Sequence, residues 1–240
     1  MRVDLSIILR PTMQLFDNSS EEIPTSTWQN IIDWARIHYR DRLFRRDEQI
    51  PTRPQLIYLV NRGAVRLVSK SENQSETLSE SEEFLQESFL GFISAKKPFE
   101  IVAQSSFNIC AYAHVDQTQV VWLYWKDLKN WPEFNQQLYE AFRYQHQRKL
   151  LWLSALGQRK TIDRLTSFLT LLLEEHGITE EENCCLPYSL THAQIGSAIG
   201  STRVTVTRLM GKLRRQGIIS VKDDNSICLN LDRLTSLRLD

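Results

Sequence analysis

Two arginines, Arg203 and Arg208, stand in a basic stretch near the end of the chain. A guanidinium group carries a fixed fork of N–H donors, so it can form two parallel hydrogen bonds with one partner. The O6 and N7 atoms of guanine present a matching pair of acceptors in the major groove of DNA. Between Asn183 and Lys222 the sequence contains no acidic residue that would compete for these side chains. The chemistry they suggest is hydrogen bonding to base edges.

The residues around these arginines predict two short helices joined by a tight turn. Thr191 and Gln194 have the spacing of a capping box, which starts a helix, and Gly200 stands where that helix has to end. Thr202 can cap a second helix that begins at Arg203. Apolar residues at helical spacing form the inward face of the second helix: Val206, Leu209, Met210 and Leu213. Its basic and polar residues are therefore expected on the outer face.

Two helices of this kind, the second with a basic tip, predict a helix-turn-helix that places its second helix in the major groove. After Gly217, apolar runs at residues 218–221 and 227–231 flank a polar turn and predict a β-hairpin wing. The alternative is a helical hairpin with a solvated basic face. The residues expected to contact double-stranded DNA are Thr191, His192, Ser201, Thr202, Arg203, Val204, Thr207 and Arg208.

Short β-type runs between Leu43 and Trp125 predict a small antiparallel β-roll. The runs at residues 56–60 and 64–68 are joined by three residues ending in Gly63, which predicts two strands and a tight turn. Later strands are expected at residues 100–103, 109–114 and 119–124, and an amphipathic helix is expected at residues 26–39. Polar and acidic residues 71–87 are interpreted as an exposed loop.

A long helix is predicted from Pro132 to Leu156, because proline suits a first helical turn and apolar residues recur along the segment. Its apolar stripe comprises Phe134, Leu138, Ala141 and Phe142, then Leu150, Trp152, Leu153 and Leu156. A stripe of this length is suited to pairing with a second copy, so a homodimer is expected. A further helix is predicted at residues 161–176, with Gly177 as its C-cap.

These elements predict an α+β fold in three parts: an antiparallel β-roll with a sensor-like role, a dimerisation helix and a winged helix-turn-helix. The boundaries are expected at residues 1–131, 132–157 and 158–240. No apolar run approaches the ~18 residues that a membrane span needs, and no secretory signal is recognisable, so a cytoplasmic protein without a membrane partner is expected.

The net charge of zero argues against a nucleic-acid partner, but its distribution favours one. Basic residues gather within the acid-free block: Arg203, Arg208, Lys212, Arg214, Arg215 and Lys222. The four cysteines lack metal-knuckle spacing and are interpreted as buried or idle thiols of a reducing cytosol: Cys110, Cys184, Cys185 and Cys228. The five histidines are scattered, so no metal site or cofactor is predicted.

The order of small β-roll, long helix and winged helix-turn-helix resembles the CRP/FNR superfamily of bacterial transcription regulators, over nearly the whole chain after about residue 25. Residues 199–209 (IGSTRVTVTRL) are very similar to the NtcA-type global nitrogen regulators of cyanobacteria. In the roll the resemblance is topological and rests on residues 57–63 and 89–93. It implies a non-enzymatic regulator that binds a palindromic DNA site as a homodimer and contacts RNA polymerase.

The resemblance also bears on which bases are read. Arg203 and Arg208 match the two recognition-helix arginines of the family, but Val204 stands where the cAMP-responsive members have a glutamate. A glutamate accepts a hydrogen bond from cytosine, whereas valine offers only apolar contact, for instance to a thymine methyl. A half-site of the GTA type is therefore expected rather than TGTGA.

The sensor side departs from the family patterns. Phe92 follows Gly91 where cyclic-nucleotide binders carry an acid, and residues 94–106 contain no arginine to pair with a phosphate, so cAMP is not expected as effector. Gln145 and Leu150 align with the arginine and glutamate by which the nitrogen regulators hold 2-oxoglutarate, so that ligand is not clearly supported either. The N-terminal cysteine cluster of the iron–sulfur members is absent.

Residues 143–149 interrupt the apolar stripe of the long helix with polar side chains. An anionic effector at the junction of roll and helix is one explanation, and a solvated helix face in a permanently active regulator is the other. The candidate effector-binding residues are Gly91, Phe92, Ile93, Arg143, Gln145, His146 and Lys149.

Two further functions compete with the transcription regulator. A metal-dependent, cupin-like enzyme would need clustered histidines and carboxylates, yet the roll offers only His114 with Asp116. An architectural or partner-binding protein would leave the outward Arg203 and Arg208 without a use. A regulator is therefore expected, with an unidentified effector or none.

Overall fold

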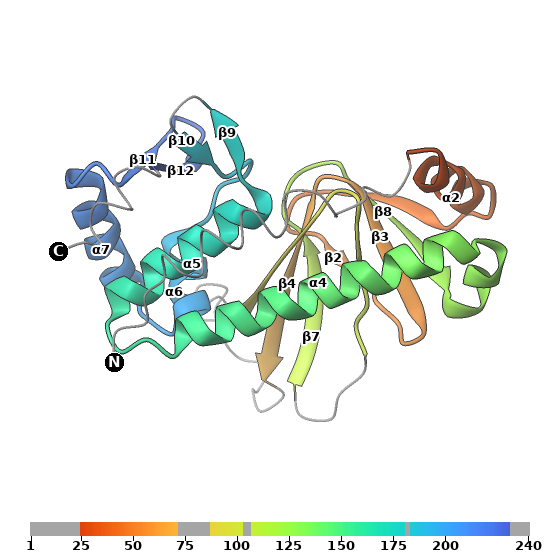
Figure 1. Cartoon of the computed structure of the whole chain (residues 1–240), viewed down its shortest axis with the longest axis horizontal. Coiled ribbons are helices and arrows are strands. Elements are labelled where there is room, and N and C mark those ends of the chain that lie inside the picture. Colours follow the sequence, from red (N-terminus) through yellow and green to blue (C-terminus); the bar gives the residue numbers. More distant parts are fainter. Residues whose placement is uncertain (1–24, 72–86, 103–106, 181–182, 231–240) are drawn as a thin grey trace.

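The structure, a computed structural model, describes residues 25–71, 87–102, 107–180 and 183–230. The chain forms an elongated molecule in which a β-roll and a helical head are connected by one long helix, α4 (Figure 1). The elements of the roll side are α2 (Thr25–Ile37), β1 (Asp41–Phe44), β2 (Gln49–Ile50), β3 (Leu56–Arg62), β4 (Ala64–Ser71), β5 (Glu87–Ser94), β6 (Lys97–Phe99), β7 (Phe107–Ala113), β8 (Thr118–Tyr124) and the 3-10 helix η1 (Trp125–Asn130).

Two antiparallel four-stranded sheets build the roll, in the orders β1-β8-β3-β6 and β2-β7-β4-β5. Between them lies an apolar core whose largest members are the stacked rings of Tyr58 and Phe99. The tight hairpin predicted at Gly63 is wrong, because β3 and β4 belong to different sheets and do not pair. Gly63 has the expected positive φ of 83°, but the turn moves the chain from one sheet to the other.

Two further expectations for the roll have different outcomes. The strand expected at residues 100–103 is wrong, since the strand in this region is β6, which ends at Phe99. The loop predicted at residues 71–87 falls largely outside the described residues. The helix and the other strands agree with the expected ranges to within three residues, the largest difference being at the end of β4.

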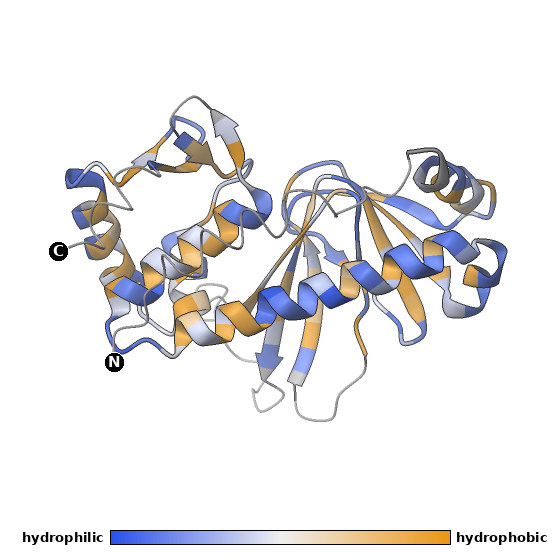
Figure 2. Cartoon of the chain, in the orientation of Figure 1, coloured by the Kyte–Doolittle hydropathy of each residue, from blue (hydrophilic) through white to orange (hydrophobic). Residues whose placement is uncertain are grey.

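Helix α4 (Pro132–Leu156) has the predicted bounds, with Pro132 in its first turn. The single apolar stripe expected along it is wrong, because the apolar residues divide between two faces. Phe134 and Leu138 are buried against α2 and the roll, whereas Leu150 and Leu153 stay exposed. Figure 2 shows the hydrophilic middle of α4, an apolar stretch at its head end and alternating colours toward its other end.

The head begins with α5 (Thr161–His176), which also has the predicted bounds. It continues with β9 (Ile178–Glu180), β10 (Asn183–Cys185), α6 (His192–Ile199), α7 (Arg203–Arg215), β11 (Ile219–Val221) and β12 (Ile227–Asn230). The predicted wing is the antiparallel pair β11–β12, which belongs to a four-stranded sheet of order β11-β12-β10-β9. One apolar core connects these helices and strands and extends to Phe89 and Phe92 of the roll.

The cysteines differ from expectation. Cys185 and Cys228 lie opposite each other on β10 and β12 and form a disulfide, so the interpretation of all four as idle thiols is wrong. Cys110 and Cys184 are free and buried. The described residues contain no group of three or more His, Cys, Asp or Glu side chains that could hold a metal ion. None of the described helices is long and apolar enough to cross a membrane.

Candidate nucleic-acid interface and its connection to the roll

The start of α6 is fixed by its own side chains, as the sequence predicts. The Thr191 hydroxyl accepts a hydrogen bond from the Gln194 backbone N–H, and the Gln194 side chain accepts one from the Thr191 backbone N–H. Gly200 ends the helix in the left-handed conformation, with φ of 62°. The Ile199 carbonyl at this end accepts a hydrogen bond from the Arg164 guanidinium of α5, which holds α6 on the head.

The turn between α6 and α7 is tight, and this depends on a glycine inside α6. A Cβ atom at Gly196 would lie 2.7 Å from the Ser201 carbonyl oxygen, and the Gly196 carbonyl accepts the Ser201 backbone N–H at 2.8 Å. Thr202 then caps α7 by accepting the Thr205 backbone N–H. The angle between the two helices is thus set by backbone contact.

The outer face of α7 carries the residues that the sequence assigned to DNA. Its inner residues are buried: Val206, Leu209, Met210 and Leu213. Arg203, Thr207 and Arg208 are exposed, and the Val204 side chain is 79% exposed at the tip of the helix. The Val204 side chain is therefore accessible for contact with another molecule, such as a base methyl group.

A hydrogen-bonded pair connects the outer faces of the two helices. Thr207 donates its hydroxyl proton to the Arg203 carbonyl, so the Nδ1 atom of His192 must be the donor to the Thr207 oxygen, at 2.8 Å. Burial and the nearby Arg203 charge lower the pKa of His192, which favours the neutral ring. His192 and Thr207 therefore fix the relative position of α6 and α7 next to the candidate arginines. Ser201 is half-buried in the turn.

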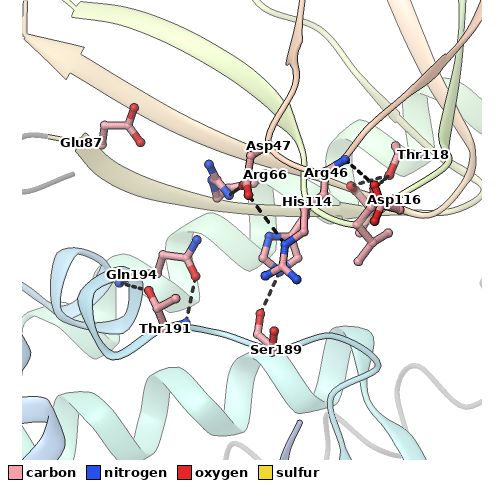
Figure 3. Close-up of polar contacts among 12 residues, drawn as sticks. Arg46, Asp47, Arg66, Glu87, His114, Asp116, Thr118, Ser189, Thr191 and Gln194 are labelled. Atoms are coloured by element: carbon pink, nitrogen blue, oxygen red, sulfur yellow. Dashed lines mark hydrogen bonds and ion pairs between the residues drawn. The ribbon is translucent and has the colours of Figure 1, made fainter. Parts of the chain in front are cut away.

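The head is packed against the roll of its own chain. The Ser197 hydroxyl of α6 donates to the Glu87 carbonyl at 2.5 Å and accepts the Phe89 backbone N–H at 2.8 Å, so it binds both ends of one segment of β5. The His114 ring donates from Nε2 to the Ser189 carbonyl just before α6 (Figure 3). Burial lowers the pKa of His114 to about 4, so the ring is neutral at pH 7.

Buried ion pairs and close contacts hold α4 in the same interface. Arg148 of α4 contacts Glu174 and Glu175 of α5, at 3.1 and 3.4 Å. Lys149 donates a hydrogen bond to the Leu90 carbonyl of β5. Sequence patterns did not reveal this interface, because they show which residues are apolar but not which element covers them.

The structure brings together only some of the candidate effector residues. A Cβ atom at Gly91, where φ is 127°, would lie 2.7 Å from the Lys149 ammonium, so this glycine allows α4 to approach β5 closely. Phe92, Ile93 and Gln145 line one cavity beside this contact. Arg143 and His146 are exposed on another face of α4.

Sequence reasoning missed the residues that complete the cavity from the head. They come from the end of α5 and from the segment before α6, and they include His176 and Tyr188. Their position next to β5 depends on how the head packs on the roll. No local pattern in the sequence carries that information, although the unusual burial of two histidines can be recognised once the fold is known.

The head and the chain as a whole are similar to known DNA-binding regulators. Residues 163–237 match the model of the Crp-like helix-turn-helix domain. The chain is 29% identical over 169 residues to a global nitrogen regulator of Nostoc sp., covering 69% of this chain and 73% of the relative. It is 41% identical over 71 residues to a global nitrogen regulator of Synechococcus elongatus, covering 30% of this chain and 32% of the relative.

Solved structures share the whole fold at low identity. FixK2 from Bradyrhizobium japonicum aligns with a TM-score of 0.61 and 22% identity, over 82% of this chain and 96% of that chain. A cyclic nucleotide-binding domain containing protein from Listeria monocytogenes aligns with a TM-score of 0.68 and 14% identity, over 85% and 98%. The similarity therefore includes the roll, the long helix and the head together.

Proposed function

We propose that this chain, whose helix-turn-helix is Crp-like and which is similar to the global nitrogen regulators, is a CRP/FNR-type transcription regulator that binds a palindromic DNA site as a homodimer and reads a GTA-type sequence in each half. The observation that carries this proposal is the exposed face of α7, on which Arg203, Val204 and Arg208 lie together. Arg203 would contact a guanine through two hydrogen bonds, and Val204 a thymine methyl group.

The capping residues of α6 and α7 have a supporting role in this proposal. Thr191, His192, Ser201 and Thr202 lie at the two helix starts, where backbone N–H groups and small polar side chains suit phosphate oxygens. These contacts would fix the register of the protein on DNA without selecting a sequence. Thr207, already bonded to His192, would hold the recognition surface in place.

The homodimer would form through α4, since regulators of this family bind DNA as dimers. Tyr139, Leu150 and Leu153 are exposed on one face of α4, at intervals of three and four residues or their multiples. Arg143 and His146 lie between them on the same face. Pairing about a two-fold axis would place the two α7 helices ~34 Å apart, one turn of DNA.

The remaining assignments follow from this role. We divide the chain into a sensor-like roll (residues 1–131), the dimerisation helix (132–157) and the DNA-binding head (158–240). A regulator that acts on bacterial transcription works in the cytoplasm, where the DNA lies, and RNA polymerase is its proposed protein partner. We assign it no catalytic activity.

The residues of the roll and α4 suit neither cAMP nor 2-oxoglutarate as an effector. The Phe92 ring, which replaces the acid of cyclic-nucleotide binders, packs between His114 and Tyr188, with ring centroids 4.6 and 4.5 Å away. Gln145 donates to the Pro98 carbonyl, and Leu150 is exposed, so neither offers a charge to 2-oxoglutarate. We expect calorimetry to detect no tight cAMP binding, because the phosphate would lack a partner. Micromolar binding would contradict this assignment.

The DNA assignment is tested by comparing two arginines of the same helix. Arg203→Ala should weaken binding to a GTA palindrome by about 1–3 kcal/mol per half-site and flatten the preference for one guanine. Arg215→Ala is the matched control, because Arg215 is also exposed but lies about 18 Å along the helix, at 1.5 Å per residue. Fluorescence anisotropy on specific and random duplexes measures both. Equal losses on the two duplexes for Arg203→Ala would exclude direct readout.

A further inference from the structure

A cavity of about 430 Å³ lies where the roll, α4 and the head meet. The roll contributes the end of β5 and the start of β6, and the head contributes residues 175–178 and the segment before α6. Phe92 on this side packs with the head core, whereas Ile93 contributes to the core inside the roll. Both residues line the cavity, which therefore lies at the end of β5, between the core of the head and the core of the roll. Its volume falls within the range of small-molecule sites, ~300–1,000 Å³.

Polar groups line part of the cavity, and its charged lining residues are Lys97 and Glu175. Ser94 and His176 are hydrogen-bonded, with 2.5 Å between Oγ and Nδ1, and the His176 side chain is only 3% exposed. Burial and the charges of Arg148, Lys97 and Lys149 lower the pKa of His176 to about 3, so the ring is neutral. Arg148 is already paired with two glutamates. Within the described residues Lys97 forms no ion pair, so its charge is available to a ligand.

Beside these polar groups the wall of the cavity is apolar and partly aromatic, and the His176 ring centroid lies 6.1 Å from that of Phe92 and 6.0 Å from that of Tyr188. Phe92 and Tyr188 form one wall, with ring centroids 4.5 Å apart, and Ile178, Pro187 and Val115 complete it. The Tyr188 hydroxyl is buried beside Ser94 and forms no hydrogen bond of regular geometry among the described residues. An apolar body with a hydrogen-bonding group therefore suits this wall.

From these observations we propose that the cavity binds a small aromatic carboxylic acid. Its carboxylate lies beside Lys97 and Ser94, and its ring lies against Tyr188 and Ile178. A ligand in this position contacts the roll, α4 and the head at once. Given the DNA-binding function proposed above, its occupancy changes how firmly the head is held and hence the affinity for DNA.

The binding part is tested by fluorine NMR with p-fluorobenzoate as the probe and p-fluorobenzamide as its neutral counterpart. We expect the acid to bind in the millimolar range or tighter, and the amide to bind at least about tenfold more weakly. Lys97→Met should weaken the acid about tenfold. Lys96→Met is the matched control, because Lys96 is the neighbouring exposed lysine and does not line the cavity. It should leave binding unchanged.

A second variant tests the location of the site. Ile178 is 54% exposed on β9, so Ile178→Trp can fill the cavity from its rim without disturbing the core. It should abolish binding of p-fluorobenzoate while circular dichroism and thermal unfolding show a folded head. Equal binding of acid and amide, unchanged binding in Lys97→Met or in Ile178→Trp, or no binding of the acid at millimolar concentration would each overturn the proposed site.

Coupling to DNA is measured separately. If the ligand changes DNA affinity by a given factor, DNA must change the affinity for p-fluorobenzoate by the same factor. We expect equal factors in the two titrations, and binding of the acid with no change in DNA affinity would overturn the regulatory part. If the protein fails to bind any DNA while the acid still binds, the proposed function fails and the proposed site stands.

Discussion

Two glycines inside helices of the head have different physical roles. Gly196 in α6 contacts the backbone of the turn, since an added Cβ would lie 2.7 Å from the Ser201 carbonyl oxygen. Gly211 in α7 has open space, because the nearest atom to an added Cβ is the tip of the Arg215 side chain at 3.8 Å. Replacing each glycine by alanine therefore distinguishes two effects on the stability of the head: steric contact at Gly196 and helix propensity at Gly211.

Gly196→Ala should destabilise the head by roughly 1–3 kcal/mol, because the methyl group forces the turn apart. Gly211→Ala should instead stabilise it by up to about 1 kcal/mol, because alanine favours the helix and meets no obstacle. Thermal unfolding followed by circular dichroism measures both. The same direction of shift in the two variants would contradict the packing of the turn.

The disulfide between Cys185 and Cys228 is a second feature at this scale. It connects β10 to β12 across 43 residues that include both helices of the helix-turn-helix. Closing a loop of this length in the unfolded chain stabilises the folded head by up to about 4 kcal/mol in the chain-entropy model. Cys110 and Cys184 remain as thiols.

Thiol titration of the denatured protein tests the pairing. Without reductant only Cys110 and Cys184 should react, and after reduction all four cysteines should react. The reduced protein should also unfold at a lower temperature, because the unfolded head regains conformational freedom. Four reactive thiols in the untreated protein would show that the pair is not oxidised in solution.

Among the elements, α4 has the most consequences for assembly. Its buried positions face the roll and the head, and an exposed series at three- and four-residue spacing runs along the opposite side: Tyr139, Arg143, His146, Leu150 and Leu153. This series has apolar ends and a polar middle. It is the surface on which a second copy would pair.

Leu153→Glu should weaken dimerisation by more than about tenfold, because a parallel pair brings the two new carboxylates together in an apolar layer. Gln147→Glu adds the same charge at an exposed flanking position and should have little effect. Sedimentation equilibrium gives the dissociation constants. A stable dimer in Leu153→Glu would exclude this face of α4 as the seam.

Replacing the polar middle should act in the opposite direction. In a parallel dimer each Arg143 would lie opposite its own copy, and so would each His146. Replacing both residues by leucine (Arg143→Leu with His146→Leu) turns these two polar contacts into apolar ones and should tighten the dimer by about tenfold or more. Gln145 does not belong to this series, because its side chain donates to the Pro98 carbonyl at 2.8 Å. Gln145→Leu is therefore the control that should leave the dimer constant unchanged. Equal effects of the two changes would contradict the assigned faces.

Local signals explain which elements were predictable. The helices α4, α5, α6 and α7 could be predicted from caps, proline and helical spacing, which act within a few residues. The turn at Gly63 was misassigned, because the same glycine signal serves a hairpin and a crossing between sheets. Strand pairing depends on distant residues, and the two faces of α4 depend on what packs beside it.

In the candidate site, too, some residues could be predicted from local sequence signals and others could not. The capping box at Thr191 and the outward arginines could be predicted because helix geometry alone determines their placement. The bond of Ser197 to β5 and the Ser94–His176 pair join segments that are 82 or more residues apart. Their proximity follows from the docking of the head on the roll, which sequence periodicity does not encode.

At the scale of the whole molecule, the packing of the head on the roll and the exposed face of α4 would determine where the two α7 helices lie in the proposed dimer. The roll, α4 and the head share buried contacts, so α7 is held relative to α4 within one chain. In the proposed dimer, a two-fold axis along α4 would therefore give one defined distance between the two α7 helices. The proposed function therefore predicts one spacing between the two half-sites on DNA.

Altering the spacing of a GTA palindrome tests that statement most directly. Fluorescence anisotropy would compare the original duplex with one that carries about five extra base pairs between the half-sites, which rotates them to opposite sides of the DNA. We predict that the insertion reduces affinity to near that of random DNA. Unchanged affinity with the five-base-pair insertion would contradict a rigid homodimer that reads two half-sites at once.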